Sequence, residues 1–233
     1  SREESLRMAL PAFVSPVAER YEASVRMKGL KTDLRRGPVR AVIVHFTGAG
    51  VQERFLREGV AKKDTSPFDT AVRRYTQILP GPDPHYVVGQ GGECVAVTPE
   101  NRVAYHVGTA QARQYNWWTR KRHPHAYDWW YERFKNLESP RDLADGKLWQ
   151  GGSCNANTIG IEVAPHVDKP LDPFSPKAVA TLRTLIADIL ARNNLPFDRK
   201  YIIGHCEAHP VSRTDKLNYP FDPKLRQIDL DKL

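Results

Sequence analysis

The chain has 233 residues, of which 40% are hydrophobic and 27% are charged. This composition is typical of a folded globular protein and excludes a disordered or fibrous chain. The length is sufficient for one large domain with a real core, so no disulfide scaffold is needed. Because no apolar run approaches the length of a membrane helix, we expect no transmembrane span.

The formal net charge of +8 favours an anionic partner, which can be a nucleic acid, a membrane surface or an acidic cell-wall polymer. The basic residues are spread thinly along the chain. The densest cluster, "TRKRHPH" at 119–125, lies among tryptophans and matches no nucleic-acid-binding motif. We therefore expect no nucleic-acid partner, and we take a monomer as the default state.

The three cysteines, Cys94, Cys154 and Cys206, contain no CxxC pair, so they predict neither a ribbon-type zinc site nor a disulfide framework. A single disulfide bond between two of these cysteines is still compatible with the sequence. The sequence begins at Ser1 and shows no apolar signal-peptide core, so we expect that a leader was cleaved or lies outside this sequence.

The first half of the chain alternates helical and extended patterns. A helix is expected to start at Ser15 in "SPVAERYEASVRM", with proline in its first turn. The β-branched run "RAVIVHF" at 40–46 predicts a strand that is buried on both faces and delivers His45 to a loop. A helical segment at 68–79 follows, and "HYVVGQGGECVAVT" at 85–98 has the glycine-rich turn of a β-hairpin.

The second half repeats this alternation after an unusual segment. All five tryptophans lie within 109–150, which we interpret as an insertion in the domain: Trp117, Trp118, Trp129, Trp130 and Trp149. "NTIGIEVAP" at 157–165 predicts a buried strand, the capped pattern at 175–194 predicts a helix, and "YIIG" at 201–204 predicts a strand that ends at His205. We expect an α/β fold with a mixed, central β-sheet flanked by α-helices.

Polar residues stand at the ends of these predicted strands. His45 and His205 each follow a buried strand, and neighbouring strands would bring them to one rim of the sheet. Two imidazoles and a carboxylate suit a catalytic zinc with one open position, and Asp215 is the nearest plausible carboxylate. Glu162 lies inside an apolar run, so it needs a cation, hydrogen-bond donors or an exposed strand edge nearby.

Four segments in this order resemble the zinc-dependent N-acetylmuramoyl-L-alanine amidases of the type 2 amidase and peptidoglycan-recognition-protein superfamily. They are "VIVHFT", "HYVVGQGGECVAVTPENRVAYHVG", "CNANTIGIEVA" and "GHCEAHPVSRTDKLNYPFD", within residues 40–108 and 153–223. The resemblance implies the single-domain fold of that superfamily. We expect residues 39–233 to form the catalytic domain, and residues 1–38 to form an N-terminal extension packed on it.

Carried over residue by residue, the resemblance implies that His45, His205 and Asp215 bind Zn²⁺ and that Glu162 is the catalytic acid of "IGIE". Arg213 stands where the family's "RKTD" motif has a lysine. Arginine keeps the positive charge and can donate to an oxyanion, but it cannot deliver a proton.

His106 and Asn155 are implied to lie near the substrate. Trp117 and Trp118 either wall a groove for sugars or pack the insertion onto the domain, and the sequence does not separate these alternatives.

The implied activity is hydrolysis of the amide bond between N-acetylmuramic acid and the L-alanine that begins the peptidoglycan stem peptide. The alternative is a peptidoglycan receptor on the same fold that binds muropeptides without cutting them. Because this substrate lies outside the cytoplasm, we expect a periplasmic or secreted protein.

Overall fold

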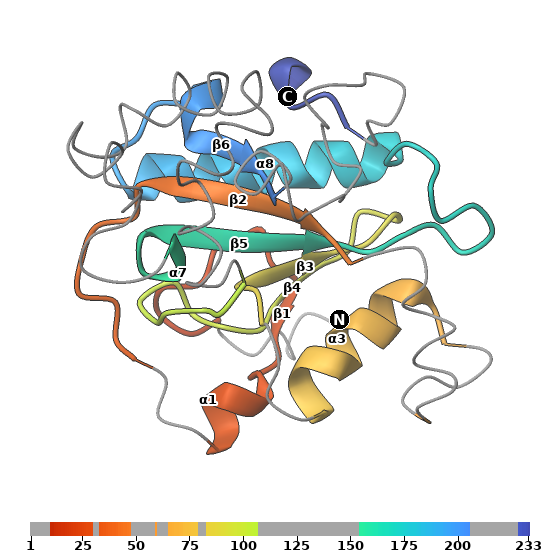
Figure 1. Ribbon diagram of the computed structural model, residues 1–233, viewed down its shortest axis with the longest axis horizontal. Helices are drawn as coiled ribbons and strands as arrows, with labels where there is room; N and C mark the ends of the chain where they lie inside the picture. Colours follow the sequence, from red (N-terminus) through yellow and green to blue (C-terminus); the bar gives the residue numbers. More distant parts are fainter. Residues whose placement is uncertain are drawn as a thin grey trace, which may run out of the picture.

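The fold was analysed in a computed structural model, which describes residues 10–29, 33–47, 59, 65–78, 83–106, 154–205 and 228–233. Its centre is a six-stranded sheet of order β1-β4-β3-β5-β2-β6 (Figure 1). The strands are β1 (Arg20–Tyr21), β2 (Ala41–Phe46), β3 (Tyr86–Val88), β4 (Cys94–Ala96), β5 (Thr158–Val163) and β6 (Ile202–Gly204).

The strand directions make the sheet mixed but mostly parallel. β6, β2, β5 and β3 run parallel to their neighbours, while β3 and β4 form the antiparallel hairpin predicted from the glycine-rich turn. At the edge, β1 pairs parallel to β4. The predicted fold class, a mixed central sheet flanked by helices, is confirmed.

One face of the sheet is covered by α8 (Pro176–Arg192), as Figure 1 shows. The helix begins where predicted, because the Ser175 side chain accepts a hydrogen bond from the Ala178 amide and Pro176 occupies the first turn. Its buried side chains pack on alternate residues of β2 and β5. They are Ala178, Leu182, Leu185, Ile186, Ile189 and Leu190.

The opposite face carries α3 (Pro67–Gln77), which Ser66 caps through a hydrogen bond from the Asp69 amide. Phe68, Val72 and Tyr75 of α3 share an apolar cluster with Val87 and other residues of the β3–β4 hairpin. The predicted helix at 68–79 is confirmed, with its observed bounds one residue earlier at the start and two residues earlier at the end.

The N-terminal segment corrects one prediction. No helix starts at Ser15, because its amide donates to the Tyr86 hydroxyl at 2.8 Å and Arg20–Tyr21 then joins the sheet as β1. The helix in this region is the short α1 (Val25–Gly29), preceded by Ser24, whose hydroxyl accepts from the Met27 amide at 3.3 Å. Pairing with β4 therefore overrides the local helical signal of proline after serine.

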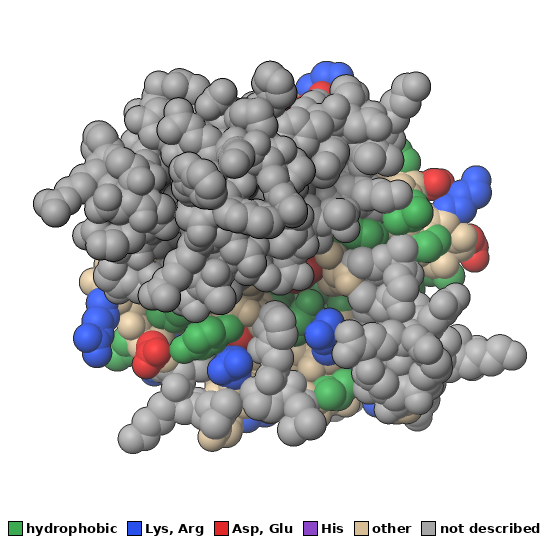
Figure 2. Space-filling model, viewed as in Figure 1, with side chains coloured by type: hydrophobic (Ala, Val, Ile, Leu, Met, Phe, Trp, Pro, Cys, Tyr) green, Lys and Arg blue, Asp and Glu red, His purple; other side chains and the backbone are tan. Residues whose placement is uncertain are grey.

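Short helical segments complete the described chain. They are α7 (Cys154–Asn157), η3 (Arg199–Tyr201) and η5 (Leu230–Lys232). Among the helices that the structure describes, none combines the length and apolar character needed to cross a bilayer. On the face shown in Figure 2, the described Lys and Arg side chains are scattered among apolar and acidic ones. The predicted insertion at 109–150 lies outside the described residues.

Candidate active site

Three neighbouring parallel strands deliver the predicted site residues to one end of the sheet. In the strand register, His45 of β2 lies opposite Glu162 of β5, and Val44 lies opposite Gly204 of β6. His205 follows Gly204 directly and so reaches the same level. All three residues stand at the carboxyl ends of their strands, where open parallel sheets form their ligand sites. The prediction that distant histidines meet at one rim is confirmed for His45 and His205.

The two histidines face each other through corresponding ring atoms. Their Nδ1 atoms are 2.9 Å apart, and the ring centroids are 4.2 Å apart. The Glu162 Oε1 atom lies 4.0 Å from Nδ1 of His45. Both histidine rings are buried, whereas the Glu162 side chain keeps 13% of its surface exposed. Glu162 is therefore the most exposed side chain of the trio, although its Oε2 atom is buried.

These donors fit a zinc ion in type, since imidazole nitrogen and carboxylate oxygen are its usual ligands. The two Nδ1 atoms, 2.9 Å apart, are close enough to act as ligands of the same cation. Within the part of the chain that the structure describes, no three His, Cys, Asp or Glu side chains are grouped closely enough to hold a metal ion. Asp215 and Arg213 lie outside the described residues.

A third histidine, His106, contacts the other ring nitrogen of His45. The Nδ1 atom of His106 lies 2.8 Å from Nε2 of His45, and its Nε2 atom lies 3.2 Å from the Thr158 hydroxyl. The Asn155 carboxamide accepts a hydrogen bond from the His106 backbone amide at 3.0 Å. Both His106 and Asn155 are buried. The structure thus gives them contacts within the protein, and their predicted contact with substrate stays a prediction.

Burial controls the protonation of this region. Burial is the largest of the causes that lower the pKa of His106 to about 3, and electrostatic interactions with His205 and Arg35 contribute to the same shift. His106 is therefore neutral at physiological pH. Burial likewise lowers the pKa of His85, whose Nδ1 atom accepts a hydrogen bond from the Gly160 amide at 3.0 Å. His85 therefore supports β5 through this hydrogen bond.

Tyr75 brings α3 into the site. Val87 lies opposite Glu162 in the register of β3 and β5, so both side chains point to the α3 face, where Tyr75 packs with Val87. The pKa of the Tyr75 hydroxyl is raised well above its usual value, first by burial and then by the negative charge of Glu162, with a hydrogen bond between the two side chains contributing as well. Tyr75 therefore meets the carboxylate from the side of the helix.

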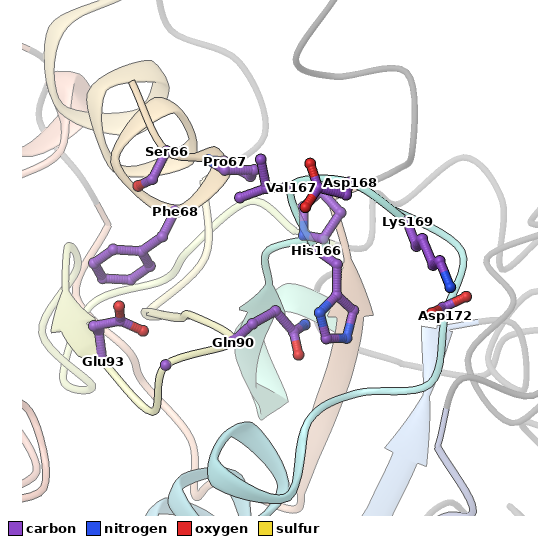
Figure 3. Close-up of a pocket in the computed structure, with 12 residues that line it drawn as sticks. Ser66, Pro67, Phe68, Gln90, Glu93, His166, Val167, Asp168, Lys169 and Asp172 are labelled. Atoms are coloured by element: carbon purple, nitrogen blue, oxygen red, sulfur yellow. The ribbon is translucent and has the colours of Figure 1, made fainter. Parts of the chain in front are cut away.

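A pocket of about 450 Å³, here called the lateral pocket, is lined in part by the residues that follow β5. Figure 3 shows that its walls come from the start of α3, the turn between β3 and β4, and the loop that follows β5. Glu93, Asp168 and Asp172 line it together with Lys169 and His166, so charges of both signs surround the hollow. None of His45, His205 or Glu162 lines it, so the lateral pocket is distinct from the site that these residues form.

The sequence interpretation missed three contributors: Tyr75, Thr158 and Gly160. A signal existed for two of them, because Thr158 and Gly160 alternate with Glu162 on one face of a predicted strand. A glycine inside a buried strand also marks a close approach by another group. Tyr75 had no such signal, because an aromatic residue on the inner face of a helix is normally part of the core. Trp117 and Trp118 lie outside the described residues.

Several solved structures are similar to this chain. An AmpD crystal structure (a selenomethionine derivative) aligns with a TM-score of 0.49 and 18% identity, covering 94% of this chain and 97% of that one. The catalytic domain of XlyA aligns with a TM-score of 0.47 and 16% identity, and the alignment covers 90% of this chain and 97% of that domain. Drosophila peptidoglycan recognition protein SD aligns with a TM-score of 0.38 and 11% identity, and the alignment covers 81% of this chain and 82% of that one.

A search of curated proteins found no match to this chain. The sequence model of one protein family, described as N-acetylmuramoyl-L-alanine amidase, matches residues 35–217, which is most of the chain. That span includes β2, β5 and β6, and with them both histidines and the glutamate at the carboxyl ends of these strands. The chain belongs to the N-acetylmuramoyl-L-alanine amidase family.

Proposed function

We propose that this protein hydrolyses the amide bond between N-acetylmuramic acid and the L-alanine of a peptidoglycan stem peptide. The observation that carries the proposal is the convergence of His45, His205 and Glu162 at the ends of three adjacent parallel strands. Two facing imidazoles supply nitrogen ligands for a metal, and the carboxylate beside them can act as a general base in amide hydrolysis.

We assign zinc binding to His45, His205 and Asp215. The two described ligands fit through their facing Nδ1 atoms, and Asp215 follows from the family motif in the sequence. When bound, zinc supplies Lewis acidity, which polarises the scissile carbonyl and makes water acidic enough to lose a proton near neutral pH.

Glu162 acts in this proposal as the general base and then as the general acid. Its carboxylate takes a proton from the attacking water while the new carbon–oxygen bond forms. When the carbon–nitrogen bond breaks, the same proton passes to the departing amine of L-alanine. The products are a free stem peptide and a carboxylic acid on the lactyl group. The position of Glu162 Oε1, 4.0 Å from Nδ1 of His45, supports this role.

Arg213 is assigned to the oxyanion that develops on the carbonyl oxygen. Its guanidinium can donate two hydrogen bonds, but it stays protonated at any physiological pH and so cannot replace the proton-donating function of a lysine. Glu162 therefore handles every proton transfer in this proposal. We place part of the stem peptide in the lateral pocket, whose lining of both charge signs suits a peptide with carboxylate and amine groups.

The substrate class also leads us to propose a periplasmic or secreted location. The second candidate function, a receptor that binds muropeptides without cleaving them, is favoured by one observation: Arg213 stands where the family motif has lysine. The two functions differ in whether stem peptide is released.

The test is to incubate purified muropeptides with the zinc-loaded protein and to measure released stem peptides by mass spectrometry. We expect release that stops when a chelator removes the metal and resumes when zinc is restored. The matched control is Glu162→Gln, which keeps the shape of the side chain but cannot accept a proton. Binding of muropeptide without release at any pH would establish the receptor and defeat the enzyme.

A further inference from the structure

His106 is a buried histidine that the proposed reaction leaves without a role. Its Nδ1 atom lies 2.8 Å from Nε2 of His45, and its own Nε2 atom lies 3.2 Å from the Thr158 hydroxyl. Only 6% of its surface is exposed. Both ring nitrogens are therefore occupied by partners inside the protein.

The orientation of His45 decides which nitrogen faces the metal. Its Nδ1 atom points to Nδ1 of His205 and to the Glu162 carboxylate, so this atom is the ligand in the site proposed above. A neutral imidazole carries one proton, and a metal on Nδ1 requires that proton to be on Nε2. The Nε2–H group then faces His106.

The geometry points to His106 as a positioning residue that accepts the Nε2–H hydrogen bond of His45 and holds its ring in the tautomer that presents Nδ1 to the metal. This inference rests on the proposed zinc site. His106 can accept through Nδ1 only when its own proton is on Nε2, and the Thr158 hydroxyl stands where it receives that proton as a hydrogen bond. Metal-binding histidines generally need such a partner on their second nitrogen.

Two features keep His106 in this arrangement. A Cβ atom at Gly160 would lie 2.4 Å from Cγ and 2.6 Å from Nδ1 of His106, so only a glycine leaves space for the ring. The Asn155 side chain holds the His106 backbone.

The decisive measurement is zinc affinity, determined by competition with a chromophoric chelator. His106→Leu removes the acceptor, and we expect zinc affinity to fall about 10- to 100-fold. His106→Asn places a carboxamide oxygen near the position of Nδ1, and we expect it to restore most of that loss. The matched control is His85→Leu, which replaces another buried histidine that hydrogen-bonds to Gly160 and not to His45. Its zinc affinity should stay close to that of the wild type.

The outcomes separate the two proposals. A wild-type protein that binds no zinc defeats the proposed function. Wild-type binding that is unchanged in His106→Leu overturns the role of His106 and leaves the proposed function standing. Should His106→Leu not fold, the tautomer of the zinc-loaded wild type decides, measured by long-range proton–nitrogen NMR. A proton on Nε2 of His106 supports the inference, and a proton on Nδ1 overturns it.

Discussion

Gly160→Ala is the substitution whose effect the structure defines best. Gly160 lies in the middle of β5 and faces the side of the sheet that carries the candidate site. A Cβ atom there would lie 2.4, 2.6 and 2.8 Å from Cγ, Nδ1 and Cδ2 of His106. Real Cβ atoms do not approach so closely, so the ring or the strand has to move.

The magnitude follows from what surrounds the ring. His106 is hydrogen-bonded at both nitrogens and buried, so it has no open direction in which to move. Overpacking of this kind costs about 1–3 kcal/mol. Alanine also restricts the unfolded chain, which offsets about 0.4–1 kcal/mol of that cost. We therefore expect a net loss of about 1–2 kcal/mol, which for a chain of this size lowers Tm by about 2–8 °C.

The assay is thermal or urea unfolding followed by tryptophan fluorescence, with Gly37→Ala as the matched control. A Cβ atom at Gly37 would meet only the Asn157 carboxamide oxygen at 3.5 Å, an ordinary contact, so we expect a change within about 0.5 kcal/mol. If Gly160→Ala is as stable as this control, the close packing of His106 on β5 is wrong.

Three further predictions concern groups around the same site. Glu162→Gln should bind zinc normally but lower kcat by about 10²- to 10⁴-fold, as measured by stem-peptide release, because it cannot accept a proton. Tyr75→Phe should lower kcat by about tenfold, with KM and zinc content unchanged, because the phenol orients the Glu162 carboxylate; an unchanged kcat would contradict this role. His85→Gln should reduce the pH dependence of stability. The pKa of His85 in the folded state lies well below 6.5, so the unfolded chain alone binds this proton and wild-type stability falls as pH drops below 6.5. Between about pH 8 and about pH 5.5, protonation of this residue in the unfolded chain lowers the free energy of unfolding of the wild type by about 1.4 kcal/mol. We expect His85→Gln not to show this loss when both proteins are measured by urea unfolding.

The strands and the meeting of the histidines were predictable because each rests on a local pattern. Apolar β-branched runs end at His45 and at His205, and the acid in "IGIE" stands out within its strand. What the sequence did not contain was the order of the strands. The structure supplies it, by placing β2 between β5 and β6. Because β5 and β6 both run parallel to β2, their residues reach the same end of the sheet.

The parts that were missed depend on contacts between distant segments. Ser15 has the local signature of a helix start, but the pairing of β1 with β4 prevails. His106 looked like a group for the substrate, because nothing in its own segment shows that His45 and Thr158 would enclose it. Tyr75 follows the ordinary pattern of a buried helix face, and only the packing of α3 on the sheet brings it to Glu162.

The two faces of the sheet divide stability from chemistry. On the α8 face, five leucine and isoleucine side chains of the helix are almost completely buried, and each contributes about 1.5–3 kcal/mol by leaving water. On the opposite face, β5 presents Thr158, Gly160 and Glu162, which contribute little apolar area. The space above them is filled by His106 rather than by core side chains. Because the α8 face stabilises the fold, buried polar groups are tolerated around His45. Substitutions that remove hydrogen bonds there should therefore impair metal binding and turnover far more than they lower the free energy of unfolding.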